Sequence, residues 1–439
     1  MTHSPQDSGQ YPPLVRSALA RASRRLLPGL FILYIIAYLD RINVSFASLA
    51  MNQDIGLGSE AYGLGAGIFF LGYVIFEIPS NLILNKVGAR RWIARIMVSW
   101  GLATVALASV WEPKGFMALR FLLGAAEAGF FPGIILYLTY WFPSGVRARA
   151  VALFMTATPV AGLIGSPVSG WIMQMHGMLG LAGWRWLFIL EGVPAVALGV
   201  LVWLLLPDSP AQAAWLEPEE RDALEKQLNA ERAAVAASHL SGLRQGLTSP
   251  RVWLLGFVYF CSVLAMYALV MWLPQIVGAI TGGDAFSVGL DVMVAYGFAC
   301  VGMVVIGASS DRLGERRWHL TGSFCLCLAG MLLLTKAATL PAVLAGASLA
   351  AMGIWGMLGP FWGLATSYMT GAAAAAGIAL INSMGNLGGF LGPYVMGWIK
   401  ANTGGFSEGF LLVAGLMVLG ALPVLMMRPA RGVSQRREG

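Results

Sequence analysis

The feature that most constrains this chain is a series of twelve apolar stretches, each long enough to cross a lipid bilayer as a helix. A membrane-spanning helix needs about 20 mostly apolar residues. Only 11% of the 439 residues are charged, against about 25% in soluble domains. A water-soluble enzyme and a disordered chain are therefore excluded, and we expect an all-α membrane protein in a lipid bilayer. The predicted spans are 28–50, 62–86, 91–111, 116–141, 148–176, 183–207, 251–280, 287–310, 318–338, 341–370, 373–401 and 406–428.

Basic residues predict the orientation of these spans, because Lys and Arg concentrate on the cytoplasmic side. Of the 28 Lys and Arg residues, 22 lie on one side of the predicted membrane and two lie inside spans. The other four lie on the opposite side and are Lys114, Arg185, Lys336 and Lys400. This asymmetry predicts that both termini are cytoplasmic. The expected organisation is a tail 1–27, a six-helix bundle 28–207, a cytoplasmic linker 208–249, a second six-helix bundle 250–428 and a tail 429–439.

The net charge of +7 does not indicate nucleic-acid binding, because the basic residues form short clusters between apolar stretches, where topology explains them. The four cysteines lie in apolar segments and form no CxxC pair, so we expect neither a disulfide framework nor a metal site. The sequence supplies no nucleophile–base pair and no metal cluster. We therefore expect a protein that is not an enzyme and that needs no cofactor.

Two loops repeat one pattern at an offset of 226 residues. The first reads Asn81-x-x-x-Asn85-Lys86-x-Gly88-x-Arg90-Arg91, and the second reads Gly307-x-x-x-Asp311-Arg312-x-Gly314-x-Arg316-Arg317. Two six-helix halves in parallel repeat explain this offset, with a substrate site expected at mid-membrane where the halves meet. The second loop resembles the signature loop of the major facilitator superfamily. The residues expected to act in gating are Gly88, Arg90, Asp311, Arg312, Gly314 and Arg316.

Ionisable residues inside membrane spans are costly to bury and usually functional. At about 1.5 Å per residue, Asp40 and Glu127 lie about 18 and 16 Å from the ends of their spans, close to the middle of the membrane. Carboxyls at this depth can carry protons, because the loss of water disfavours their charged form. Arg41 presents a planar fork of donors that fits a carboxylate, and Arg120 shares a helix face with Glu127. Alternatively, these four residues only pair with one another and hold helices together.

The second half of the chain carries no counterpart of these charges. Adding 226 to 40, 41 and 127 gives Met266, Tyr267 and Gly353. This half offers polar and aromatic groups instead, which suit the recognition of hydroxyls or of an apolar substrate body. The candidates are Tyr267, Trp272, Asn382 and Asn386, although each of these types is also common in simple helix packing.

These residues carry a family resemblance. The chain resembles the anion:cation symporter family of the major facilitator superfamily over essentially its whole length. The resemblance rests on Tyr38-Leu-Asp-Arg-Ile-Asn-Val-Ser45, Gly72-Tyr73, Arg120-Phe-Leu-Leu-Gly-Ala-Ala-Glu127 and Phe131-Pro132-Gly133. Within that family, the runs 62–95 and 120–141 are most similar to bacterial tartrate transporters.

The resemblance implies a major facilitator fold in the bacterial inner membrane, working as a monomer by alternating access. It implies that Asp40 and Glu127 couple transport to protons, that Arg41 binds a substrate carboxylate with help from Tyr38 and Tyr73, and that Arg120 joins the charge network. It also implies a substrate contact from an asparagine at 382 or 386. The expected activity is proton-coupled import of a small hydroxylated anion, with tartrate first. The alternatives are an aromatic acid such as hydroxyphenylacetate or phthalate, and a transport-dead sensor.

Overall fold

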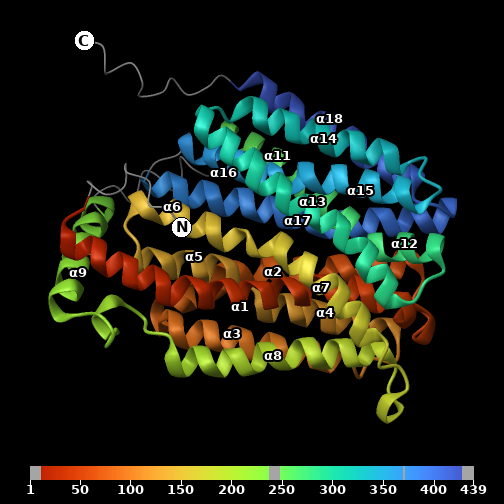
Figure 1. The fold of residues 1–439 in the computed structure, drawn as a ribbon, viewed down its shortest axis with the longest axis horizontal. Coiled ribbons are helices and arrows are strands. Elements are labelled where there is room, and N and C mark those ends of the chain that lie inside the picture. The colour runs from red at the N-terminus through yellow and green to blue at the C-terminus, as the bar shows by residue number, and fades with distance from the viewer. Residues whose placement is uncertain (1–10, 237–247, 369–370, 428–439) are drawn as a thin grey trace.

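The structure is a computed structural model that describes residues 11–236, 248–368 and 371–427, and the described residues form helices and no strands. Figure 1 shows two helical bundles, with a surface helix α9 (Pro218–Ala236) at one end. The first bundle contains α1 (Pro13–Asp54), α2 (Ser59–Val87), α3 (Ala89–Leu107), α4 (Pro113–Glu127), α5 (Phe130–Trp141), α6 (Ser144–Met155), α7 (Ala157–Met173) and α8 (Gly183–Leu205). The second contains α11 (Pro250–Val270), α12 (Leu273–Thr281), α13 (Ala285–Leu313), α14 (Arg317–Leu334), α15 (Leu340–Gly356), α16 (Leu358–Ser367), α17 (Gly371–Thr403) and α18 (Ser407–Met426). Two 3-10 turns, η1 (Met178–Gly180) and η2 (Pro210–Gln212), lie in the loops.

Each of the twelve predicted spans corresponds to one helix or to two consecutive helices, so the prediction of an all-α, two-bundle membrane protein is confirmed. In the described residues, ten helices or continuous helix pairs are long and apolar enough to cross a membrane. The two remaining spans are α3 and α17. Three arginines near the start of α3 lower the hydropathy of that helix without preventing it from packing inside a bundle.

Four predicted spans are broken near their middles, at α4/α5, α6/α7, α11/α12 and α15/α16. The first break is set by Gly129, which takes a left-handed backbone conformation with φ +86° that other residues rarely adopt. The other three are followed within one turn by Pro159, Pro274 and Pro360. Proline lacks the N–H that would continue the preceding helix and fits the first turn of a new one.

Residues 13–27 differ from the predicted polar tail, because they form the start of α1. Val15, Ala18 and Ala22 are buried along one helix face, and the guanidinium of Arg21 on another face forms ion pairs with Glu217 at 3.3 Å and with Glu220 at 3.4 Å. The apolar residues recur at three- and four-residue spacing, which gives this segment a face to bury. Residues 1–10 of this tail, residues 237–247 of the linker and the whole predicted tail 429–439 lie outside the described residues.

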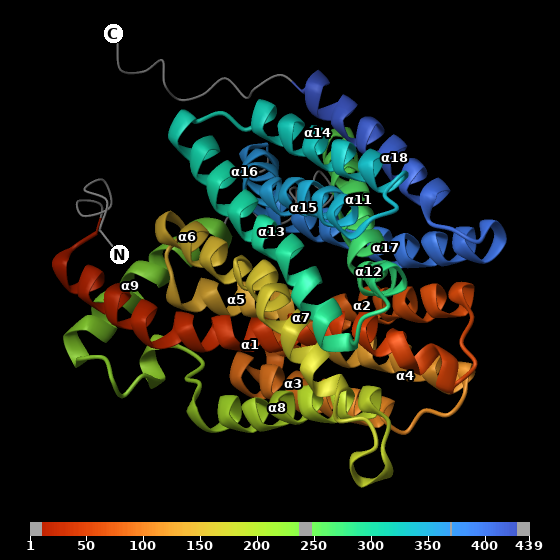
Figure 2. The same cartoon turned by 45° about the vertical axis from the view of Figure 1, so that its right-hand side comes forward.

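The bundles meet along two helix pairs, α2 with α17 and α7 with α13, as the two views of Figures 1 and 2 show. We call the end of the molecule that holds α9 the linker end, and the opposite end the far end. Near the far end, a Cβ at Gly67 would overlap the carbonyl oxygen of Phe390, and a Cβ at Gly289 would overlap that of Ser166. Glycine at these positions therefore permits backbone-to-backbone contact between the bundles.

Polar side chains reinforce this far-end contact. The Gln275 amide nitrogen donates to the Ser48 hydroxyl at 2.9 Å, and the Lys400 ammonium donates to the Gln275 carbonyl oxygen at 3.3 Å. The Tyr62 hydroxyl donates to the Met271 carbonyl at 2.9 Å. The Gln275–Ser48 and Tyr62–Met271 bonds cross between the bundles, Lys400 holds Gln275 within the second bundle, and together with the close glycine contacts they seal the far end.

We expect Gly67→Val to open this seal, because the added side chain cannot fit against the Phe390 carbonyl. Overpacking of this kind costs about 1–3 kcal/mol. It destabilises only the state in which the far end is sealed. Spin labels at the exposed positions Glu60 and Asn402, in a cysteine-free background, should report a longer distance between the bundles. Gly415→Val is the matched control, since a Cβ there meets nothing within 4 Å. An unchanged distance distribution in Gly67→Val would contradict the assignment.

Candidate functional site

A cavity of about 70 Å³ lies between the two bundles, on the linker-end side of the seal. Side chains next to three of the four helix breaks reach its wall, from Phe131, Met155, Thr158 and Leu358. Six of the predicted substrate residues also line it, and they are Tyr38, Arg41, Tyr73, Tyr267, Asn382 and Asn386. Discontinuous helices that meet a cavity at mid-membrane are typical of transporter binding sites.

The central interaction of the site is an ion pair between Arg41 and Glu127. Arg41 Nε and Nη2 lie 2.7 and 2.6 Å from Glu127 Oε1. The glutamate side chain is fully buried, whereas 11% of the arginine side chain remains exposed. Glu127 is the last residue of α4, which ends here because Gly129 takes its left-handed conformation. Both Arg41 donors use one carboxylate oxygen, and the other, Oε2, has no hydrogen-bond partner.

Asp40 lies beside this pair but faces away from the cavity, into the first bundle. Its Oδ2 accepts a hydrogen bond from the Thr104 hydroxyl at 2.8 Å, and its Oδ1 accepts one from the Asn43 amide at 3.1 Å. The residue is 1% exposed. Asn43 follows Asp40 by one helical turn within the Tyr38–Ser45 stretch, and this spacing is the signal from which sequence reasoning could have found it. Thr104 comes from a distant segment and had no such signal.

Arg120 binds backbone rather than a carboxylate. Its Nε and Nη2 donate to the Gly65 and Ala66 carbonyls of α2 at 3.3 and 3.2 Å, and its guanidinium lies 5.0 Å from the Phe69 ring centroid. Nη1 has no hydrogen-bond partner. The structure therefore places Arg120 behind the cavity, where its charge can act on Asp40 and Glu127 without reaching the cavity wall.

The second bundle supplies neutral groups to the cavity. The Tyr267 hydroxyl interacts with the Arg41 guanidinium, and Tyr38 contacts Met266 through its hydroxyl at 3.9 Å from the sulfur. Arg41 and Tyr267 are also 226 residues apart, so the repeat brings equivalent positions face to face. Trp272 lies elsewhere: its indole N–H donates to the Pro393 carbonyl at 3.2 Å within the far-end seal. Cavity residues absent from the sequence prediction include Tyr34 and Tyr259.

A second contact between the bundles crosses the linker-end side of the cavity. Glu77 Oε1 accepts a hydrogen bond from the Asn382 amide at 2.7 Å, which joins α2 to α17. Asn386, one turn further along α17, lines the cavity and leaves its amide nitrogen without a hydrogen-bond partner. Of the two asparagines, Asn386 is therefore the one with a donor free for a bound molecule, while Asn382 is engaged by Glu77.

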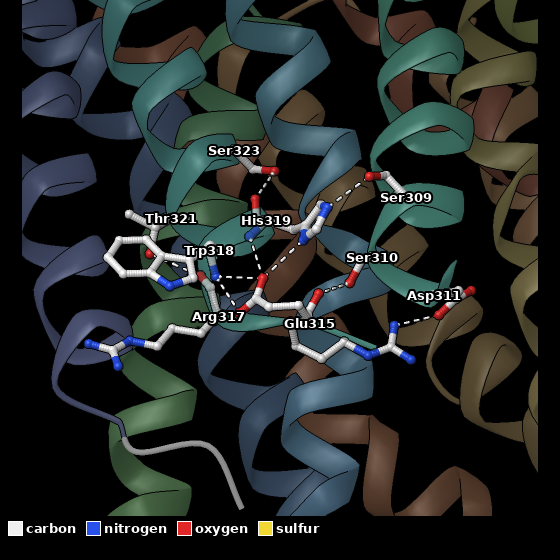
Figure 3. A network of polar contacts seen from close by, with 10 residues as sticks. Ser309, Ser310, Asp311, Glu315, Arg317, Trp318, His319, Thr321 and Ser323 are labelled. Atoms are coloured by element: carbon white, nitrogen blue, oxygen red, sulfur yellow. Dashed lines mark hydrogen bonds and ion pairs between the residues drawn. The ribbon is translucent and has the colours of Figure 1, made fainter. Parts of the chain in front are cut away.

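The second signature loop forms a compact network at the linker end (Figure 3). Arg316 Nη1 pairs with Asp311 Oδ1 at 2.5 Å, and Gly314 turns the chain with φ +63°. Glu315 accepts hydrogen bonds from the backbone N–H groups of Trp318 and His319 and so caps the start of α14. Arg312 is exposed.

In the first signature loop, the acidic partner of the arginine comes from outside the motif. Asp208, just after α8, accepts a hydrogen bond from the backbone N–H of Arg90 at 2.7 Å, and its other oxygen lies 3.8 Å from the Arg90 side chain. Gly88, with φ +97°, leaves room for this carboxylate. Asp208 thus replaces the acid that Asn85 cannot supply, a partnership between segments 118 residues apart that the loop pattern does not encode.

Within the described residues, no three His, Cys, Asp or Glu side chains are grouped so that they could hold a metal ion. The cysteines there are free thiols, two of them buried at Cys261 and Cys327. The chemistry of the cavity therefore rests on arginine, carboxyl, tyrosine and amide groups.

Comparison with known proteins identifies the class of this protein. The sequence model of the Major Facilitator Superfamily matches residues 30–393, so the chain belongs to that superfamily. It is 49% identical to a "Putative tartrate transporter" of Agrobacterium vitis, over 93% of this chain and 94% of that protein. It is 41% identical to a "Quinolone resistance transporter" of Acinetobacter baumannii, over 91% of this chain and 92% of the relative.

The fold is also that of solved transporters. The crystal structure of a bacterial homologue of the human lysosomal transporter Spinster superposes with a TM-score of 0.74 at 16% identity, covering 92% of this chain and 98% of that one. The chain is thus a multi-pass membrane transporter. Its relatives differ in the substrates that their names give, so the substrate has to be argued from the cavity.

We expect Glu315→Gln to loosen the start of α14. Partial burial alone would raise the pKa of Glu315, but hydrogen bonds from the Trp318 backbone and from the side chain and backbone of His319 outweigh it and lower the pKa. The cap therefore contributes fully above the usual carboxyl range and is lost as pH falls through the lowered value. Hydrogen-exchange protection of the first α14 amides should drop about two- to fivefold, matching about 0.5–1 kcal/mol for a lost cap.

The control is Glu112→Gln, because Glu112 directly precedes α4 but makes no side-chain cap bond. In the unsubstituted chain, protection at α14 should fall on acidification, after correction for intrinsic exchange, whereas Glu315→Gln should show no such fall. Equal pH dependence in both proteins would exclude Glu315 as the cap.

Proposed function

We propose that this protein imports a small hydroxylated organic anion together with protons, with tartrate as the first candidate. The observation that carries the proposal is the Arg41–Glu127 pair at the cavity wall. Arg41 can bind a substrate carboxylate, and Glu127 holds the same guanidinium in the absence of substrate. One arginine shared between two carboxylates gives a direct way to couple proton and substrate binding.

The coupling step follows from competition for Arg41. A protonated Glu127 loses most of its attraction for the guanidinium, because the pair depends on the carboxylate charge. Nε and Nη2 of Arg41 are then available to a substrate carboxylate entering the cavity. When substrate leaves, Arg41 is a buried cation without a partner, which favours release of the Glu127 proton and re-formation of the pair.

Asp40 is proposed as the second proton site. It shares no hydrogen bond with a cation, and its partners, Thr104 and Asn43, are neutral donors. Arg120 supplies positive charge close enough to influence Asp40 and Glu127 while it stays fixed to α2. Protons on Asp40 and Glu127 would offset the negative charge that the substrate brings into the membrane.

The cavity suits a hydroxylated acid. Five tyrosines line it, at positions 34, 38, 73, 259 and 267, and their hydroxyls can donate or accept hydrogen bonds. Asn386 adds an amide. The relative's name supports tartrate. The same aromatic rings also favour an aromatic carboxylate, which is the second candidate, because such rings prefer to pack against one another.

We propose that the linker end faces the cytoplasm, since most Lys and Arg residues lie there. The sealed far end then faces outward, and the cavity stands on the cytoplasmic side of the seal. Transport would alternate this state with one in which the glycine contacts of α2 and α7 open. One chain encloses the whole cavity, which supports a functional monomer.

Asp40→Asn and Glu127→Gln should each abolish uptake driven by a proton gradient. Both substitutions remove a titrating group but keep a side chain of nearly the same size. The measurement is uptake of radiolabelled L-tartrate into proteoliposomes with an acidic exterior, alongside tartrate exchange at equal pH. We expect exchange to survive where net uptake is lost. Lys114→Ala, in the first turn of α4 at the far end, is the control. Full gradient-driven uptake in either variant would remove that carboxyl from the coupling scheme.

Arg41→Ala should weaken substrate binding by about 10- to 150-fold, since a hydrogen-bonded charge pair contributes about 1.5–3 kcal/mol. Arg41→Lys keeps the charge but lacks the two-pronged donor, so it should recover only part of this loss. Calorimetry on the purified protein, with tartrate and with an aromatic acid as ligands, measures the affinity for both candidate substrates in one experiment. If only the aromatic acid binds, and its binding is lost in Arg41→Ala, the second candidate replaces tartrate. Unchanged binding in Arg41→Ala would refute the carboxylate site.

A further inference from the structure

Glu77 lies behind the cavity wall and holds one of the residues that form it. It belongs to α2, is 7% exposed and does not line the cavity, whereas Asn382 of α17 does. The Asn382 amide nitrogen donates to Glu77 Oε1 at 2.7 Å, at the short end of the range for an N–H···O bond. The described part of the chain offers the Asn382 side chain no other hydrogen bond.

This bond fixes which end of the Asn382 amide faces the cavity. An amide nitrogen only donates and an amide oxygen only accepts, and a carboxylate only accepts. Glu77 therefore holds the nitrogen of Asn382. Oδ1 of Asn382 has no partner among the described residues, yet it is not one of their enclosed unpaired atoms, so it is open to the cavity that this residue lines. Glu77 Oε1 accepts in the same way if Oε2 carries a proton.

Helix α17 thus presents an acceptor and a donor to the same cavity. Asn386 follows Asn382 by one helical turn, which places their Cβ atoms about 5–6 Å apart on one face. The Asn386 amide nitrogen has no hydrogen-bond partner. A substrate hydroxyl between the two can donate to Asn382 Oδ1 and accept from Asn386 Nδ2. A ketone oxygen only accepts, so it would leave Asn382 Oδ1 unpaired and facing its lone pairs.

The other polar groups of the cavity cannot make this distinction. The five tyrosine hydroxyls rotate to suit either a donor or an acceptor. The Arg41 guanidinium only donates, and it would bind the carboxylate that hydroxy acids and keto acids share. An amide held from behind by a carboxyl group has no such freedom, so the choice between the two kinds of acid depends on Asn382.

We propose that Glu77 is a positioning residue through which the transporter selects hydroxy acids over keto acids of the same carbon skeleton. It acts by holding the Asn382 amide with its oxygen toward the substrate. This selectivity rests on the proposed import of a hydroxylated organic anion, and it identifies the substrate hydroxyl as the group that is recognised. The hydrogen bond between α2 and α17 therefore has a role in specificity in addition to joining the bundles.

Calorimetry on the purified protein tests the selectivity with acids that differ only at this group. Malate and freshly dissolved oxaloacetate form one pair, and mandelate and benzoylformate form an aromatic pair. The hydroxy acid should bind about 5- to 150-fold more tightly than its keto partner, because the keto acid leaves a buried acceptor unpaired. Glu77→Gln should bring the two affinities within about threefold, because glutamine either accepts from the Asn382 nitrogen or donates to its oxygen and lets the amide turn over.

The double variant Glu77→Gln with Asn382→Asp is the matched rescue. The glutamine then donates to the new carboxylate, which offers only acceptors to the substrate. The preference for the hydroxy acid should return, although both anions should bind more weakly beside the added charge. Glu60→Gln, exposed at the start of α2, is the control. The proposal is overturned if the unsubstituted protein binds both acids of a pair equally, or if Glu77→Gln weakens both equally and keeps their ratio.

Solid-state NMR of 15N-asparagine-labelled protein in lipid bilayers tests the amide orientation without a substrate. The Asn382 side-chain signal, identified by its loss in Asn382→Leu, should shift or split in Glu77→Gln and stay in place in Glu60→Gln. An unmoved signal in Glu77→Gln would also overturn the proposal. If the signal responds but neither pair of acids binds, the proposed import of a hydroxylated anion is rejected together with the selectivity, and only the orientation of Asn382 by Glu77 stands.

Discussion

The fold of the site depends on one buried ion pair, between Arg41 and Glu127. Taking two charges out of water is expensive, and their attraction compensates only when the geometry is good. The chain achieves that geometry by ending α4 at Glu127, with Gly129 in a left-handed conformation directly behind it. The guanidinium also lies over the adjacent rings of Phe69 and Tyr73, 5.6 and 5.2 Å from their centroids. The break between α4 and α5 therefore places the Glu127 carboxylate within reach of Arg41.

The two bundles divide the remaining work. The first holds the mid-membrane charges, with Arg41 paired to Glu127 and Asp40 hydrogen-bonded to Thr104 and Asn43, so these groups move together when the bundle moves. The second presents tyrosine and asparagine to the same cavity and meets the first through glycine contacts and through hydrogen bonds such as that from Asn382 to Glu77.

Apolar length and the 226-residue repeat were sufficient to predict twelve spans, two halves and a mid-membrane site, because bilayer thickness and gene-level repetition both leave regular patterns. Arg41, Tyr267 and Asn386 are substrate candidates from charge or residue type, and Tyr73 is one from the family resemblance; all four line the cavity. Partnerships between distant segments were not predictable. Three contacts depend on how the helices pack, and neither hydropathy nor residue spacing indicates them. They are the cap of Asp208 on α3, the hydrogen bond of Thr104 to Asp40, and the place of Trp272 in the far-end seal.

The repeat also explains why the site is asymmetric. Equivalent positions meet near the axis that relates the halves, and there Arg41 faces Tyr267 rather than a second arginine. Two facing guanidiniums would repel and would each need a counterion, so a single carboxylate could never neutralise the site. Tyrosine keeps a hydrogen-bond donor at that position without the charge. The cavity is left with one cation, which one carboxylate can satisfy, and Glu127 and the substrate are the two that compete for it.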